Sequence, residues 1–167
     1  MNTGQMLLTL GALVLFSLLV LRVNSSQLST QETMQNSKFG ILAVSVASSF
    51  IEAASEKAFD EKSIDDFITS LSALTSKGNF GIDSNEYPDS ADTFDDFDDY
   101  DGYTETVTNM PSAVFNVSCN VDYVDPEGGS FVTSNKTWHK QLVVKVTSPS
   151  MSDTIKMTKV FSYWKFP

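Results

Sequence analysis

The chain has little of what most enzyme and metal sites are built from. Its 167 residues include one cysteine and one histidine, so an internal disulfide is excluded and a histidine-rich metal site has little support. No nucleophile elbow, P-loop or dinucleotide-binding glycine pattern occurs. We therefore expect no enzymatic activity and no organic cofactor. Cys119 alternates with valines, which predicts a small buried apolar residue rather than a reactive thiol, and His139 is expected on the surface of a strand.

Clustered positive charge is also missing. Phosphate neutralisation needs grouped lysine and arginine, so nucleic-acid binding is disfavoured. The net charge of −10 is not spread evenly. Residues 79–105 carry ten acidic residues and no basic one, whereas residues 1–78 sum to −2 and residues 106–167 to +2. The acidity is therefore the property of one segment rather than of the whole chain.

Residues 6–23 contain no proline and no charge before Arg22. As a helix, residues 5–23 would extend roughly 28 Å, close to the hydrocarbon thickness of a bilayer. Three interpretations fit: a secretory signal, a membrane anchor, or a pilin-type helix that packs against its neighbours in a filament core. The first is disfavoured, because no base precedes the run and no A-x-A-like site follows it. Hydropathy does not separate the other two, and Arg22 alone is a weak orientation signal.

Nothing in the sequence ends this helix after Val23. Residues 24–38 lack glycine and proline, and residues 39–59 place apolar side chains at helical spacing. We predict one helix with an apolar segment, residues 1–24, and an amphipathic continuation, residues 25–62, whose apolar stripe packs on a sheet. That stripe consists of Phe39, Ala43, Val46, Ala47, Phe50, Ala54 and Ala58.

Residues 63–109 are predicted to hold a short helix and an acidic aromatic loop. A capping-box pattern at residues 63–66 predicts a helix over residues 64–74, ended by Lys77 and Gly78. Aromatic residues then recur at every third position of the acidic segment. We expect them to dock on the globular part of the chain, with the carboxylates pointing outward. These aromatic residues are Phe94, Phe97, Tyr100 and Tyr103.

The aspartates among these aromatics raise a calcium hypothesis, because hard cations prefer carboxylate oxygens. EF-hand spacing fails, since Phe97 stands where the first ligand belongs and Thr108 where the bidentate glutamate belongs. Two interpretations remain: a calcium loop of another kind, or aspartates that cap turns and face solvent, which we prefer. The candidate calcium ligands are Asp95, Asp96, Asp98, Asp99 and Asp101.

Residues 110–167 show the patterns of β-strands. Apolar and polar residues alternate strictly over residues 115–123, and Leu142, Val144 and Val146 share one face of a second strand. A third strand is predicted over residues 154–164, and turns separate the three. This order predicts a three- to four-stranded antiparallel sheet covered on one face by the amphipathic helix, hence an α+β fold.

Taken together, these parts resemble type IV pilin-like proteins, in particular minor pilins and type II secretion pseudopilins. Beside the general plan, the resemblance rests on four local stretches: residues 47–53, 58–61, 94–103 and 140–147. It implies a non-enzymatic subunit of a pilus-like filament or pseudopilus. Such a subunit crosses the bacterial inner membrane once, has its head outside the cytoplasm, and can enter an extracellular filament.

The resemblance also implies partners and processing. The partners are other pilin-like subunits, in a homo- or hetero-filament, and the contacts would come from Met6, Leu7, Leu10, Leu13, Val14, Phe16 and Leu18. The family's processing signal places cleavage between Gly4 and Gln5, with Thr9 where the family has glutamate. This departure resembles certain minor, tip-located pseudopilins, or indicates an uncleaved anchor. The alternative function is a membrane-anchored extracytoplasmic module that binds calcium or a basic partner through the acidic loop.

Overall fold

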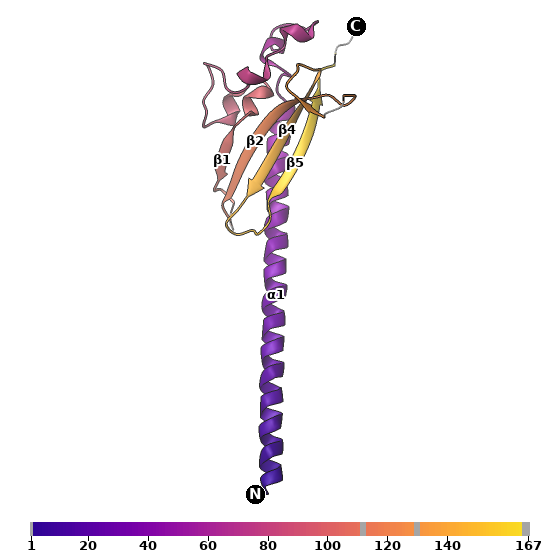
Figure 1. Cartoon of the computed structure of the whole chain (residues 1–167). Helices are drawn as coiled ribbons and strands as arrows, with labels where there is room; N and C mark the ends of the chain where they lie inside the picture. The colour runs from indigo at the N-terminus through magenta and orange to yellow at the C-terminus, as the bar shows by residue number, and fades with distance from the viewer. Residues whose placement is uncertain (1, 111–112, 129–130, 165–167) are drawn as a thin grey trace. The chain divides into compact units, whose positions relative to one another are not determined.

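The computed structural model describes residues 2–110, 113–128 and 131–164. The chain divides into two compact units, residues 1–38 and residues 39–167. The first unit is helical from Thr3 to its end. The second, called the globular unit below, joins the end of the same helix to a β-sheet and a series of short 3₁₀ turns (Figure 1).

Helix α1 spans Thr3–Ser55 without interruption, which confirms the prediction of one long N-terminal helix. Hydroxyl side chains along it donate to the carbonyl one turn earlier, as Ser17 does to Leu13 and Thr30 to Ser26, each at 2.9 Å. These local bonds let serine and threonine sit inside the helix without leaving their hydroxyl groups unsatisfied. The helix ends at Ser55, seven residues before the predicted limit at residue 62.

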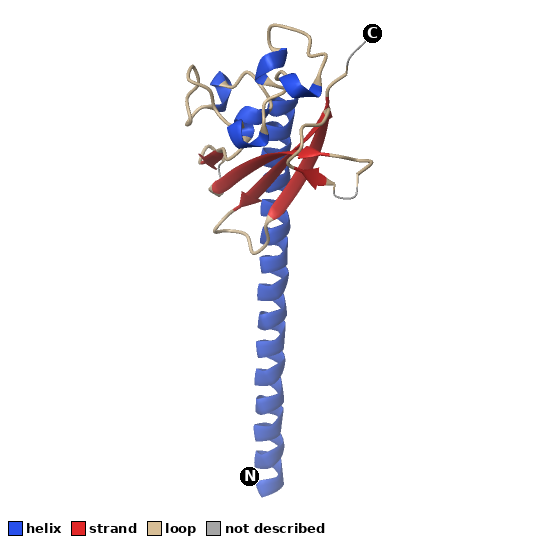
Figure 2. Ribbon diagram, turned by 45° about the horizontal axis from the view of Figure 1, so that its top comes forward, coloured by secondary structure: helices blue, strands red, loops and turns tan. Residues whose placement is uncertain are grey.

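The sheet has five strands: β1 (Thr104–Val107), β2 (Phe115–Val124), β3 (Val132–Thr133), β4 (His139–Thr147) and β5 (Ile155–Ser162). Its order is β1-β2-β4-β5, with β3 added to the end of β2, and every pairing is antiparallel (Figures 1 and 2). The α+β class and the antiparallel sheet are confirmed. The predicted strand number was too low, because β1 lies in the segment interpreted as loop and β3 is too short to show a pattern.

The core of the globular unit lies between one sheet face and the C-terminal part of α1. Register places Val117 opposite Val146 and Val121 opposite Leu142, so these side chains share that face. The helix contributes small residues, which let it approach the sheet closely. The predicted stripe is confirmed as far as Ala54: its buried members are Ala43, Val46, Ala47 and Ala54, with Phe39 and Phe50 packed beside them. Its last predicted member, Ala58, lies beyond the end of α1.

No α-helix forms over residues 64–74, and that prediction was wrong. The chain instead makes 3₁₀ turns at Glu61–Ser63 and Leu71–Ala73, and Lys77–Asn79 is a third such turn rather than a helix end. A helix here would have no continuous buried face, since Phe67 is 88% exposed. The capping box exists three residues earlier: the Asp60 carboxylate accepts from the Lys62 N–H, and Ser63 Oγ accepts from the Asp60 N–H.

The four evenly spaced aromatic residues, Phe94, Phe97, Tyr100 and Tyr103, are buried, as predicted. Phe94 meets Tyr100 and Tyr103 edge to face, with ring centroids 5.1 Å apart in both pairs, an arrangement that favours aromatic packing. The prediction that the carboxylates point outward was wrong for four of them, Glu86, Asp96, Asp98 and Asp99, which are at most 9% exposed. Their burial determines which charged groups of the globular unit are paired and which carboxyl groups have a raised pKa.

Candidate functional site

Two charged clusters lie around the acidic segment. We call Lys140, Asp60 and Asp98 the lysine cluster, and Glu86, Asp95 and Asp99 the carboxylate cluster. A short backbone bridge brings them together: the Ala58 N–H donates to Asp95 O at 3.0 Å and the Phe97 N–H to Ala58 O at 2.9 Å. The acidic segment is thereby fixed beside the residues that follow α1.

In the lysine cluster, the Lys140 ammonium uses all three of its donors. Nζ donates to Asp60 Oδ2 at 2.9 Å, to Phe59 O at 2.8 Å and to Asp98 Oδ1. The Lys140 and Asp60 side chains are 0% exposed. Burial raises the pKa of Asp60, but the Lys140 charge and several hydrogen bonds outweigh it and hold the pKa below its ordinary value. Burial raises the pKa of Asp98 despite the adjacent ammonium.

Aromatic rings close this cluster off from solvent. Lys140 Nζ lies 4.7 Å from the centre of the Phe59 ring, 4.8 Å from that of Phe80 and 5.6 Å from that of Tyr123. Rings at these distances attract a cation and exclude water. Sequence reasoning missed this cluster, because Lys140 occupies a strand position with no local acidic partner. The Tyr123 hydroxyl donates to Thr75 O at 2.6 Å, and burial raises its pKa.

The carboxylate cluster contains two of the predicted calcium candidates, Asp95 and Asp99, with Glu86, which sequence reasoning missed. One oxygen from each side chain lies within 4.8 Å of the others. Backbone donors orient two of them: Glu86 accepts from the N–H groups of Asp83 (2.8 Å) and Asp95 (3.0 Å), and Asp99 accepts from the Asp96 N–H at 2.9 Å. Burial, together with Glu86, raises the pKa of Asp95, and burial raises that of Asp99 to about 8.

The other three candidates have separate partners. Asp98 belongs to the lysine cluster. Asp96 Oδ1 accepts from the N–H groups of Asp98 and Asp99 at 2.7 and 3.2 Å, which is the predicted turn-capping role in a buried setting. Asp101 pairs with Lys77 Nζ at 2.8 Å and accepts from the Val121 N–H at 2.8 Å. The five aspartates are therefore not gathered around one point.

These buried carboxyls predict an unusual pH dependence. Burial and neighbouring carboxylates raise the pKa of Asp96 to about 9, and that of Asp99 is about 8. The folded chain therefore holds protons that the unfolded chain releases near pH 4, and this stabilisation is lost as pH rises through 8 and 9. We expect urea unfolding to show a lower free energy of unfolding at about pH 9 than at about pH 6. The loss should be roughly 1 kcal/mol per pH unit for each proton that the folded chain holds and the unfolded chain does not. Asp99→Asn should flatten the profile, and equal stability at both pH values would contradict it.

The side chains predicted for assembly belong to residues 1–38 and are exposed in the single chain. Met6, Leu7, Leu10, Leu13, Val14, Phe16 and Leu18 are between 54% and 72% exposed. The helix that carries them is long and apolar enough to span a membrane. This confirms a segment compatible with a single-pass anchor. Gly4, at the predicted cleavage site, lies in the first turn of α1 with open space around it.

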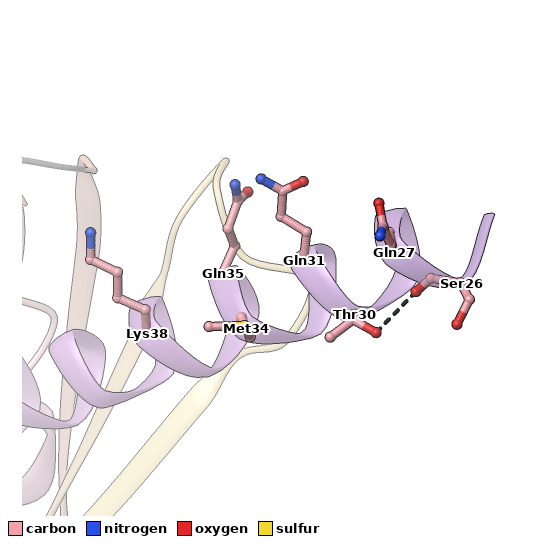
Figure 3. A pocket seen from close by; sticks show the side chains of 7 residues that line it. All are labelled: Ser26, Gln27, Thr30, Gln31, Met34, Gln35 and Lys38. Atoms are coloured by element: carbon pink, nitrogen blue, oxygen red, sulfur yellow. Dashed lines mark hydrogen bonds between the residues drawn. The ribbon is translucent and has the colours of Figure 1, made fainter. Parts of the chain in front are cut away.

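A surface hollow along residues 26–38 also lies in this unit and offers little chemistry. Its seven lining residues follow one another along α1, and three of them are glutamines (Figure 3). Thr30 Oγ1 donates to Ser26 O, and Met34 provides the apolar surface between them and Lys38 (Figure 3). A hollow lined by a single helix, with no acidic or thiol group, gives no basis for a catalytic site.

The remaining candidates are accounted for by packing. Cys119 is buried in the core, as predicted, and burial raises the pKa of its thiol to about 12. His139 is half-buried rather than on the surface, and its Nδ1 lies 2.8 Å from Ser162 Oγ on the neighbouring strand. Among the described residues, neither of them belongs to a group of potential metal ligands.

Comparisons with family models, with curated proteins and with solved structures gave no match to this chain. The function is therefore argued from the fold and from the placement of charged and apolar residues.

Proposed function

We propose that the chain is a non-enzymatic structural subunit of a type IV pilus-like filament or secretion pseudopilus. The observation that carries the proposal is the division of α1: its C-terminal residues are buried against the sheet, and its N-terminal apolar side chains are exposed in the described part of the chain. Such a helix is suited to a bilayer before assembly and to the helices of other pilin-like subunits afterwards. The globular unit would lie outside the cytoplasm of a bacterial cell.

Energetics support an assembly role for the apolar segment. Removing apolar surface from water stabilises by roughly 25 cal/mol per Å², so seven exposed apolar side chains would make a free helix insoluble. A lipid bilayer removes these side chains from water as well as a protein partner does. One helix can therefore serve first as a membrane anchor and then as a contact between filament subunits. We also propose cleavage between Gly4 and Gln5. Mass spectrometry of the N-terminus of the mature chain tests this step.

Cysteine cross-linking distinguishes a filament subunit from a solitary anchor. We expect Phe16→Cys chains in native membranes or filaments to give disulfide-linked dimers under mild oxidation, because neighbouring helices would lie side by side and each chain offers one reactive thiol. The natural Cys119 is buried with a raised pKa and should not react. A matched control is Glu127→Cys, an exposed site on the globular unit. If Phe16→Cys stays monomeric in cells that contain all the subunits, the assembly proposal is wrong.

A second candidate function, cation binding by the globular unit, is favoured by the carboxylate cluster. Glu86 and Asp99 are held in place by backbone N–H groups, and Asp95 lies beside them with a raised pKa. Mutual repulsion among carboxylates is relieved when a cation of the calcium type binds between them. This function is compatible with the structural one, since a pilin-like subunit can also bind an ion.

A thermal melt with and without calcium checks this second candidate. At a free concentration of about 100 times its dissociation constant, a ligand specific for the folded state adds about 2.7 kcal/mol to the free energy of unfolding. This raises the melting temperature of a domain of this size by several degrees. Glu86→Gln should reduce the shift, while Asp125→Asn, on a turn away from the cluster, should leave it unchanged. The same melting temperature in calcium and in chelator would rule this function out.

A further inference from the structure

The lysine cluster places an amine against a carboxylate in a closed, apolar setting. The Lys140 side chain is 0% exposed and that of Asp98 is 4% exposed, with Nζ hydrogen-bonded to Asp98 Oδ1. The rings of Phe59, Phe80 and Tyr123 surround the amine. These are the conditions under which two charged groups are costly to keep as a pair, because each has lost its hydration.

The two carboxylates around Lys140 are held differently. Asp60 accepts from the Thr75 N–H at 2.9 Å, from Thr75 Oγ1 at 3.0 Å and from the Lys62 N–H at 3.2 Å, in addition to Lys140. It is therefore well stabilised as a carboxylate. Asp98 is positioned through its backbone, because its carbonyl accepts from the N–H groups of Gly81 and Asp101 at 3.1 and 2.9 Å. This arrangement directs the Asp98 side chain at the amine and leaves Asp60 as a neighbouring base.

We propose that Lys140 and Asp98 condense to form an intramolecular isopeptide bond, with Asp60 as the proton carrier. The Lys140 nitrogen bonds to Cγ of Asp98, and the bond from Cγ to one carboxylate oxygen breaks. The ammonium loses two protons, and both leave with that oxygen as one water molecule. Asp60 Oδ2, 2.9 Å from Nζ, takes a proton from the nitrogen and passes it to the departing oxygen. No oxidant, reductant or cofactor is needed.

Two physical effects favour the condensation. Fixed neighbours react as if at effective concentrations of about 10⁵ M or more, which offsets the unfavourable equilibrium of amide formation in water. The product also replaces a desolvated ion pair by a neutral amide, and the aromatic rings that exclude water would protect it from hydrolysis. The bond would link η5 (Asp98–Tyr100) to β4 across 42 residues of sequence, in a chain whose single cysteine rules out an internal disulfide.

Mass spectrometry of the purified full chain tests the proposal without relying on any variant to fold. The wild-type protein is expected to be lighter, by the mass of one water molecule, than the mass calculated from its sequence and its observed N-terminus. A protease digest should yield a branched peptide that joins Asp98 to Lys140. A wild-type chain at the full mass, or a digest without the branched peptide, would overturn the proposal. The second result would assign the lost water to another reaction, such as succinimide formation at Asp101-Gly102.

Variants then test the role of each group. Lys140→Arg keeps the positive charge but removes the amine, and Asp98→Ala removes the reacting carboxyl, so both are expected at full mass. Lys77→Arg is the matched control, because Lys77 Nζ also contacts an aspartate, Asp101, at 2.8 Å in a more exposed setting. The Lys77→Arg variant should still be lighter than its calculated mass by one water molecule. Asp60→Asn is expected to stay unreacted, and a branched peptide from that variant would overturn the role of Asp60.

Discussion

Lys140→Met is expected to lower the free energy of unfolding by about 3–5 kcal/mol, the typical cost of removing one partner from a buried ion pair. Methionine fills a similar volume, so the loss would come from charge rather than from a cavity. Asp60 and Asp98 would remain buried without their shared cation, and both are at most 4% exposed. An isopeptide bond at Lys140 would make the loss larger. Urea unfolding monitored by tryptophan fluorescence measures the difference.

A matched control separates the charge effect from packing. The triple variant Lys140→Met, Asp60→Asn, Asp98→Asn removes all three charges, and it should recover much of the lost stability. The single variant should also become more stable on acidification, because protonation neutralises the two stranded carboxylates. If Lys140→Met unfolds at the same urea concentration as the wild-type chain, the lysine cluster has no structural role.

Leu13→Asp is expected to abolish assembly, and this is the largest functional effect that we predict. Leu13 lies in the middle of the apolar segment and is 63% exposed in the single chain. A charge at the centre of a membrane helix costs about 2.5–3.5 kcal/mol or more, and a similar penalty applies where helices pack away from water. Introduced into Phe16→Cys chains, the change should eliminate the disulfide-linked dimer.

Two controls make this result specific to the apolar segment. Leu13→Ala shortens the side chain without adding charge and should retain cross-linking at a reduced level. Gln27→Asp adds the same charge to an exposed polar part of α1 and should assemble normally. Normal cross-linking of Leu13→Asp would show that the apolar segment does not form the contacts between subunits.

Local pattern predicted the regular elements well, because each depends on periodicity within a single segment. The run from Thr3 to Ser55 has no proline, and its stripe from Phe39 onward identified the buried face. Alternation over residues 115–123 identified β2, and the shared face of Leu142, Val144 and Val146 identified β4. The prediction missed the short strands for the same reason. Strand β1 has four residues and β3 has two, too few for a pattern to stand out from loop sequence.

The candidate sites depended on contacts that no local pattern contains. Lys140 lies 80 residues from Asp60 and 42 from Asp98, and Glu86 lies nine residues before Asp95. The sequence determined that acidic charge is concentrated in residues 79–105 and that an apolar helix precedes it. Only the tertiary structure decided which carboxylates are buried, which of them meet a lysine and which meet one another. The physical reason is that the charge of a segment follows from its residues alone, whereas desolvation and ion pairing depend on distances in space. The packing of the helix end, the loop and the sheet sets those distances.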